Sequence, residues 1–264
     1  MEEAAELGSY LPLSFKSLSE QEYIAFLWDA FETNYAHGKY QFAFLAYHML
    51  TMSFVYFNIW QIKQTWPGDF EKGTIGFARD EDALLGATSP FVFSAVNERT
   101  ILRFLKLIAC DSGKIRTYAK LVGDRNDTAH ANGNIFFSTQ NALDDKISEV
   151  LRIVEDIQKH SRPVIEHCYR EFLLRSYDPE EREYPDATDQ IREILIHGHY
   201  FSHKDVEICV GFSLEGLTDE APSEPVRELH DVLVAWYGRD DENGGVWQPV
   251  TAGCDSAPPL QPDC

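Results

Sequence analysis

One polar segment of this chain, from Gly123 to Gly133, gathers the side chains that are best suited to phosphate chemistry. Within it, Arg125 stands five positions before His130. An arginine offers a planar, permanently charged fork to phosphate oxygens, and a histidine takes or gives a proton near neutral pH. The pair suits cleavage of an RNA phosphodiester, because the imidazole can serve the 2'-hydroxyl or the leaving 5'-oxygen while the guanidinium offsets developing charge. This route needs no metal.

The local pattern of the same segment predicts a helix start. Gly123 should end the preceding helix, and Asp124 can cap the next one, with another acidic residue three positions on in the capping-box position. Arg125 and Asn126 would then lie in the first turn, where unpaired N–H groups and the helix dipole favour an anion. On chemistry alone, a solvated helix start with a packing histidine at His130 is the simpler alternative.

The run Arg125-Asn-Asp-Thr-Ala-His130 resembles the R-x4-6-H motif of the HEPN superfamily, with an Asn directly after the Arg and a small residue before the His. The resemblance covers roughly residues 20 to 175, and only the motif is specific. It implies an α-helical bundle in which the motif lies at a helix junction before a long amphipathic helix. It also implies catalytic roles for Arg125 and His130 and a supporting role for Asn126.

The resemblance further implies a metal-independent endoribonuclease that leaves 2',3'-cyclic phosphate ends and takes no cofactor. Such enzymes act as homodimers whose two motifs form one composite site. They serve in prokaryotic toxin–antitoxin, abortive-infection and other anti-phage defence, so we expect an RNA substrate and an antitoxin or regulatory partner. The toxins paired with nucleotidyltransferases have a Tyr where this chain has Asn132, which argues against regulation by Tyr modification. The alternative is a catalytically inactive HEPN-like module that binds a partner protein or nucleotide.

Polar residues on otherwise apolar helices offer a second set of candidates. Glu98 and Arg99 on one predicted helix, and His48 and Asn58 on another, could line a central polar site. Single polar residues of this kind are more often hydrogen-bonded core residues. We therefore keep only Glu98 as a supporting residue.

A metal site is not expected. His197, His199 and His203 are close in sequence, but Gly198 and a helix cap at Ser202 favour a solvated junction. The chain has five cysteines, none in a C-x-x-C pair, so reduced thiols are the better interpretation. They are Cys110, Cys168, Cys209, Cys254 and Cys264.

Apolar periodicity predicts an all-α fold: a HEPN-like helical bundle over residues 1–177, a smaller helical C-terminal extension over 178–239 and a flexible tail over 240–264. The helices of the bundle are expected to start after Ser19 as N-cap, and to span Phe42 to Gln64, Ser94 to Cys110, Ile115 to Val122, and a long run from Ser138, with a kink or restart allowed at Pro163. Residues 67 to 90 should be a long connection. The extension should hold two or three short helices.

The charge balance limits the possible partners. The chain has 264 residues, is 44% hydrophobic and carries a net charge of −20, which opposes loose attraction to nucleic acid. Binding RNA would therefore need a local concentration of positive charge. The charge-free run from Tyr40 to Ile62 is long enough to span a bilayer, but its scattered polar residues favour a buried central helix. We expect a cytoplasmic protein with no membrane partner.

Overall fold

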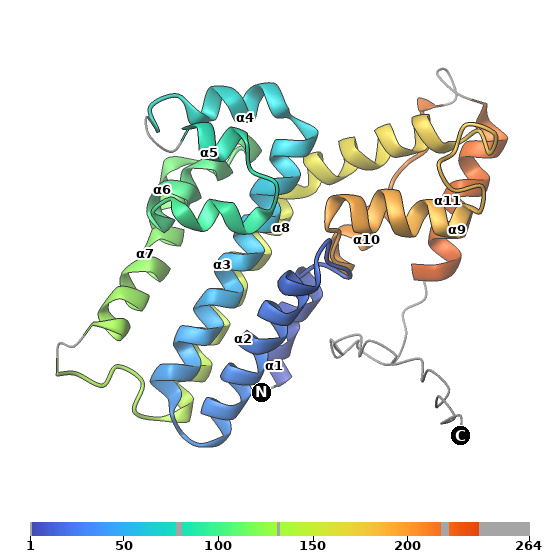
Figure 1. The fold of residues 1–264 in the computed structure, drawn as a ribbon. Coiled ribbons are helices and arrows are strands. Elements are labelled where there is room, and N and C mark those ends of the chain that lie inside the picture. Colours follow the sequence, from blue (N-terminus) through green and yellow to red (C-terminus); the bar gives the residue numbers. More distant parts are fainter. Residues whose placement is uncertain (1, 78–80, 131–132, 218–221, 238–264) are drawn as a thin grey trace, which may run out of the picture.

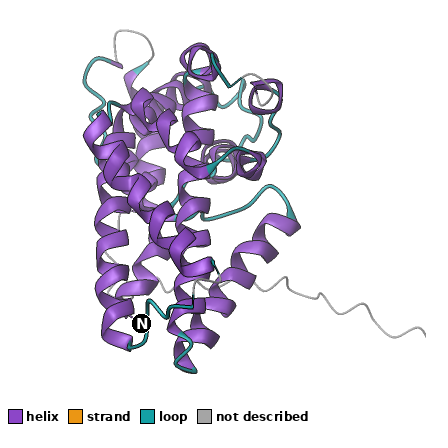
Figure 2. Cartoon of the chain, turned by 90° about the vertical axis from the view of Figure 1, so that its left-hand side faces the viewer, coloured by secondary structure: helices purple, strands orange, loops and turns teal. Residues whose placement is uncertain are grey.

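The computed structural model describes residues 2–77, 81–130, 133–217 and 222–237. These residues form an all-α fold without a strand among them, as Figures 1 and 2 show. The one β-bridge that they contain joins Pro12 to Ser202. The all-α prediction is therefore confirmed, and the predicted tail over residues 240–264 lies outside the described residues.

The helices follow one another with short connections. The first part of the chain holds α1 (Glu2–Ala5), the 3-10 helix η1 (Glu6–Tyr10), α2 (Leu18–Ala36), α3 (Tyr40–Thr65), α4 (Pro67–Thr74), α5 (Glu81–Leu85), η3 (Pro90–Ala95), α6 (Glu98–Ile101), η4 (Leu102–Ile108) and α7 (Ser112–Ala129). The second part holds α8 (Gln140–Ser176), α9 (Ala187–Gln190), the π-helix η5 (Ile191–His197), α10 (His203–Val210) and α11 (Ser223–Tyr237).

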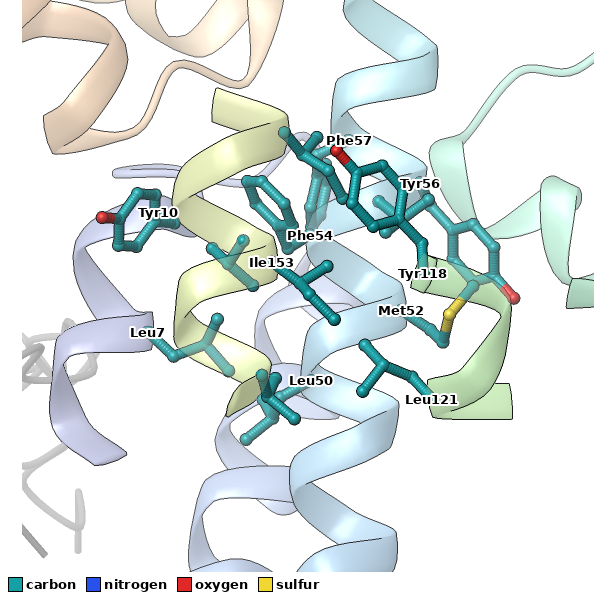
Figure 3. Packing of buried hydrophobic residues seen from close by; sticks show 14 of the residues in the cluster. Leu7, Tyr10, Leu50, Met52, Phe54, Tyr56, Phe57, Tyr118, Leu121 and Ile153 are labelled. Carbon is teal, nitrogen blue, oxygen red and sulfur yellow. The ribbon is translucent and has the colours of Figure 1, made fainter. Parts of the chain in front are cut away.

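Helix α3 is the centre of the bundle. It packs against α2, α7 and α8, and its residues are buried almost all round from Ala43 to Ile62. Figure 3 shows the apolar side chains of α3 between Ile153 of α8 and Leu121 of α7. Among the described residues, α3 alone has the length and hydropathy to cross a membrane, and 83% of its most apolar window is buried in the protein. The fold thus gives it the place of a core helix, as the sequence predicts.

Two apolar cores share helix α8. The first core contains α1 to α7 and the N-terminal half of α8, and the second begins at Ile165 and collects the helices that follow. In Figure 1, α8 extends from behind α3 to the C-terminal helices. The boundary that we drew after Tyr177 therefore differs from the division of the core. Pro163 does not interrupt α8, because it lies on the exposed side, where the carbonyl group it leaves unpaired can be solvated.

Several predicted element boundaries were wrong. Helix α2 is capped by Ser17, whose side chain accepts from the Glu20 amide, so Ser19 is already helical. The predicted helix over Ser94 to Cys110 is divided into η3, α6 and η4, because the cap at Asn97 restarts the chain. The expected connection over residues 67–90 contains α4 and α5. In the extension, the predicted capping box at Ser202 is present.

Candidate functional site

The predicted helix start at Asp124 is wrong: α7 runs without a break through Gly123 to Ala129. Its N-cap is Asp111, whose side chain accepts from the Gly113 and Lys114 amides. A single glycine inside a helix costs about 1 kcal/mol, which the burial of apolar side chains on both sides of it easily offsets. Arg125 therefore lies in the last turns of α7.

The sequence predicts Arg125 and Asn126 at a helix N-terminus, which attracts anions, but the structure places them near a helix C-terminus, which repels anions. Arg125 and Asn126 are near the C-terminal end of α7, where the helix presents carbonyl groups and the negative end of its dipole. His130 is the C-cap, and its amide donates to the Asn126 carbonyl at 3.1 Å. This end of α7 therefore does not provide an anion-binding site. Any positive charge that binds a phosphate here must come from side chains such as Arg125.

Arg125 belongs to a cluster of three charged or ionisable side chains. Its Nη2 lies 2.6 Å from Oε2 of Glu98, and the same oxygen lies 3.2 Å from Nε2 of His48. Burial alone would raise the pKa of the Glu98 carboxyl, but the hydrogen bonds and charges of His48 and Arg125 outweigh it and lower the pKa. Glu98, predicted as a supporting residue, is therefore an ionised group that orients the Arg125 guanidinium.

The cluster lies at the edge of an open pocket of about 730 Å³ between α2, α3 and α6. Arg125 and Glu98 line it together with Tyr23, Tyr56 and the polar end of Asn97. Burial raises the pKa of the Tyr56 hydroxyl, and the Glu98 charge raises it further, so this group stays protonated at neutral pH. The pocket combines aromatic walls with one cation, Arg125, and two carboxylates, Glu20 and Glu98.

His130 is outside this pocket. It is exposed at the end of α7, and it is absent from the residues that line the pocket with Arg125. Five positions along a regular helix turn the side chain by about 140°, so Arg125 and His130 point in different directions from α7. One copy of the chain thus brings Arg125 together with Glu98 and His48, and not with His130.

Two polar side chains that sequence reasoning missed hold the motif in place. Gln41 of α3 donates to the Thr128 carbonyl at 2.9 Å and accepts from the Phe136 amide at 3.1 Å, so it fixes the end of α7 and the chain that follows. Lys146 of α8 contacts Asp124 at 2.5 Å. A signal for Gln41 was available, since it is a polar residue on the charge-free run of α3.

The other candidates are dispersed. Asn58 accepts from Ser161 inside the core, and Arg99 lies against α7 beside Gly123. His197 contacts Ser14, whereas burial lowers the pKa of His199 to about 4. The described residues contain no group of three His, Cys, Asp or Glu side chains that could hold a metal ion.

The cysteines in the described part of the chain are free and buried. They are Cys110, Cys168 and Cys209. Cys254 and Cys264 lie outside the described residues.

Comparisons with known proteins add no relative. No family model matched the chain, and neither a curated protein nor a solved structure did.

Proposed function

We propose that this chain is a metal-independent endoribonuclease of the HEPN type that acts in prokaryotic toxin–antitoxin, abortive-infection or other anti-phage defence. The observation that carries the proposal is the place of the motif. Arg125 and His130 lie at one end of α7, directly before the long helix α8, and Glu98 holds the arginine at the mouth of an open pocket. Cleavage of an RNA phosphodiester needs an oriented guanidinium and an accessible imidazole at one phosphate, and the motif supplies both side chains.

In this proposal two copies of the chain complete the site. Because Arg125 and His130 diverge on one copy, the exposed His130 would act on a phosphate held by Arg125 of a second copy. The imidazole would take the 2'-hydroxyl proton or give one to the leaving 5'-oxygen. Attack of the 2'-oxygen on phosphorus breaks the bond to the 5'-oxygen and leaves a 2',3'-cyclic phosphate.

Exposed apolar side chains on α2, on α3 and just after the motif support the homodimer. Phe26 of α2 and Phe42 and Met49 of α3 have exposed fractions of 64%, 60% and 40%. Met49 also lines the pocket with Arg125, and Phe136, just after the motif, is 42% exposed. Large apolar side chains that remain exposed are often found where another protein binds. A second copy seated there would bring two motifs close together.

One observation favours the alternative function, a catalytically inactive module that binds a nucleotide or partner protein. The Arg125 guanidinium is already paired with Glu98, and this pair reduces the net positive charge available to a phosphodiester. A free nucleotide would fit the pocket between Tyr23 and Tyr56, with Arg125 at its phosphate. This alternative predicts nucleotide binding by calorimetry and no RNA cleavage.

The test is incubation of the purified chain with total RNA in EDTA, with mapping of the new ends. We expect cleavage with 2',3'-cyclic phosphate ends, and a loss of about 10²- to 10³-fold in Arg125→Ala and in His130→Ala. Matched controls are Arg175→Ala and His203→Ala, which remove exposed side chains far from α7 and should leave the rate unchanged. Equal cleavage by wild type and both motif variants would refute the proposal.

A further inference from the structure

The positive charge of this acidic protein is concentrated around the motif. Between Arg99 and Arg125 the sequence has seven Lys or Arg residues and two acidic ones, although the whole chain carries a net charge of −20. The stretch consists of α6, η4 and α7, which lie together at one side of the bundle in Figure 1. A local excess of this kind is not expected by chance in a chain with nearly twice as many acidic as basic residues.

Most of these cations are not used to stabilise the fold. Lys114 pairs with Asp156, and Arg125 pairs with Glu98. The other five are exposed, and none makes an ion pair with a described carboxylate. Four of these five, which we name the basic strip, are Arg103, Lys106, Arg116 and Lys120. By contrast, exposed arginines elsewhere are mostly paired, as Arg162 is with Glu166.

The strip leads toward the motif. Arg116 and Lys120 are one turn apart on α7, and Gly123 continues the same face of that helix. The Arg99 side chain lies over this face at Gly123. Its Nη2 is 3.4 Å from the position that a Cβ atom would occupy if residue 123 had one. Helix α6 and η4 pack against α7, so the two rows of cations lie on neighbouring elements, and the row on α7 continues along the same face toward His130, seven positions after Gly123.

A hollow of about 480 Å³ adjoins the strip. Arg103 and Lys106 line it, and Phe77 and Phe104 contribute aromatic rings that lie 5.1 Å apart between centroids. Cations beside a recess with aromatic lining are typical of surfaces that hold the phosphates and an unstacked base of a single strand. A membrane surface or an acidic protein would not require such a recess.

We propose that the basic strip binds the backbone of single-stranded RNA and leads it to the end of α7 that carries His130, with one base placed in the hollow beside Phe77. This inference rests on the proposed function, since it assumes that RNA is the substrate. It accounts for how a chain of net charge −20 can approach a polyanion: the repulsion is offset locally, where the cations are exposed and unpaired.

The test replaces all four cations of the strip by glutamine, which removes the charges and keeps the apolar stems. Binding of a labelled single-stranded RNA is followed by fluorescence anisotropy in EDTA, in a His130→Ala background that keeps the RNA intact. We expect the affinity to fall by more than about ten-fold. The slope of log K against log salt should fall by about 3, roughly 0.7 for each lost phosphate contact.

A matched control removes the same charge elsewhere. It changes four exposed arginines of the C-terminal half, Arg162, Arg175, Arg192 and Arg227, to glutamine, and should alter the affinity less than two-fold, about the change expected of distant charges. Equal losses in both variants, or an unchanged affinity in the strip variant, would overturn the proposal. So would a strip variant whose only defect is in self-association.

The same proteins separate this inference from the proposed function. If the wild type binds RNA through the strip but does not cleave it, RNA binding by the strip is supported and the nuclease proposal is refuted. If the wild type cuts RNA and the strip variant binds it normally, the nuclease proposal stands and the strip fails.

Discussion

Two carboxylates of this protein, Glu98 and Asp205, have opposite surroundings. Asp205 is 3% exposed and accepts hydrogen bonds only from neutral groups, including Gln61 at 3.1 Å and Gln158 at 2.7 Å. The Glu98 side chain is 19% exposed and contacts two basic side chains. Burial raises the pKa of the Asp205 carboxyl despite its hydrogen bonds, whereas the basic partners of Glu98 lower the pKa of that group.

The different surroundings of Asp205 and Glu98 indicate different roles, one structural and one at the candidate functional site. Asp205 joins α10 to α3 and α8 and is almost fully buried, so it acts as a link between the two cores. Glu98 opens onto a pocket and orients a cation that a ligand could reach. A carboxylate that is buried among neutral hydrogen-bond donors, such as Asp205, indicates a structural role. A carboxylate in a charged cluster at an open pocket, such as Glu98, indicates a candidate functional site.

The largest effect on stability is expected from Asp205→Ala. The substitution leaves the buried donors of Gln61, Gln158 and Ser202 without their acceptor, which should cost about 3 kcal/mol of unfolding free energy. Thermal unfolding should shift downward by roughly 6–12 °C. Asp205→Asn keeps one carbonyl acceptor and should lose about 1 kcal/mol. Equal melting of the wild type and Asp205→Ala would contradict the structural role.

Glu98→Gln should give the reverse pattern, with a large effect on RNA cleavage and a small one on stability. Without its charged partner, Arg125 is less well oriented, and a misplacement of about 1 Å costs roughly 10²-fold in rate. The free energy of unfolding should change by less than about 1 kcal/mol, because both side chains are partly solvated. A matched change, Glu166→Gln, removes an ion pair on the far half of α8 and should not affect cleavage.

The smallest expected effect is a difference in pH dependence. The pKa of Glu98 is lowered on folding, so its stabilisation is present above the unfolded pKa and is lost as pH falls through the folded one. The pKa of Asp205 is raised, so its contribution is greatest at low pH and is lost as pH rises through the folded pKa.

Urea unfolding between pH 7 and pH 3 can measure both signs. The stability gap between wild type and Glu98→Gln should shrink on acidification, and the gap between wild type and Asp205→Asn should grow, each by less than about 1 kcal/mol. A parallel response of the two variants would remove the distinction between the carboxylates.

The predictions from sequence were most accurate for long helices, whose apolar side chains repeat over many turns. The apolar α3 and the amphipathic α8 were predicted because their side chains repeat over many turns, and the capping box at Ser202 was read from local chemistry. The prediction that Gly123 ends a helix was wrong, because it relied only on the low helix propensity of glycine and the cap that follows it. The buried residues on either side of that glycine stabilise a continuous helix more than the glycine destabilises it.

The sequence by itself determined the helical class, the polar segment with Arg125 and His130, and the excess of cations before it. Only the tertiary structure decided that Arg125 faces Glu98 and His48, from helices 27 and 77 residues earlier in the chain, while His130 points away. The physical reason is that periodicity fixes which face of a helix is apolar, and packing between distant helices fixes which polar groups meet. Arg125 and His130 are therefore close in the sequence, whereas the fold of one copy does not place their side chains together.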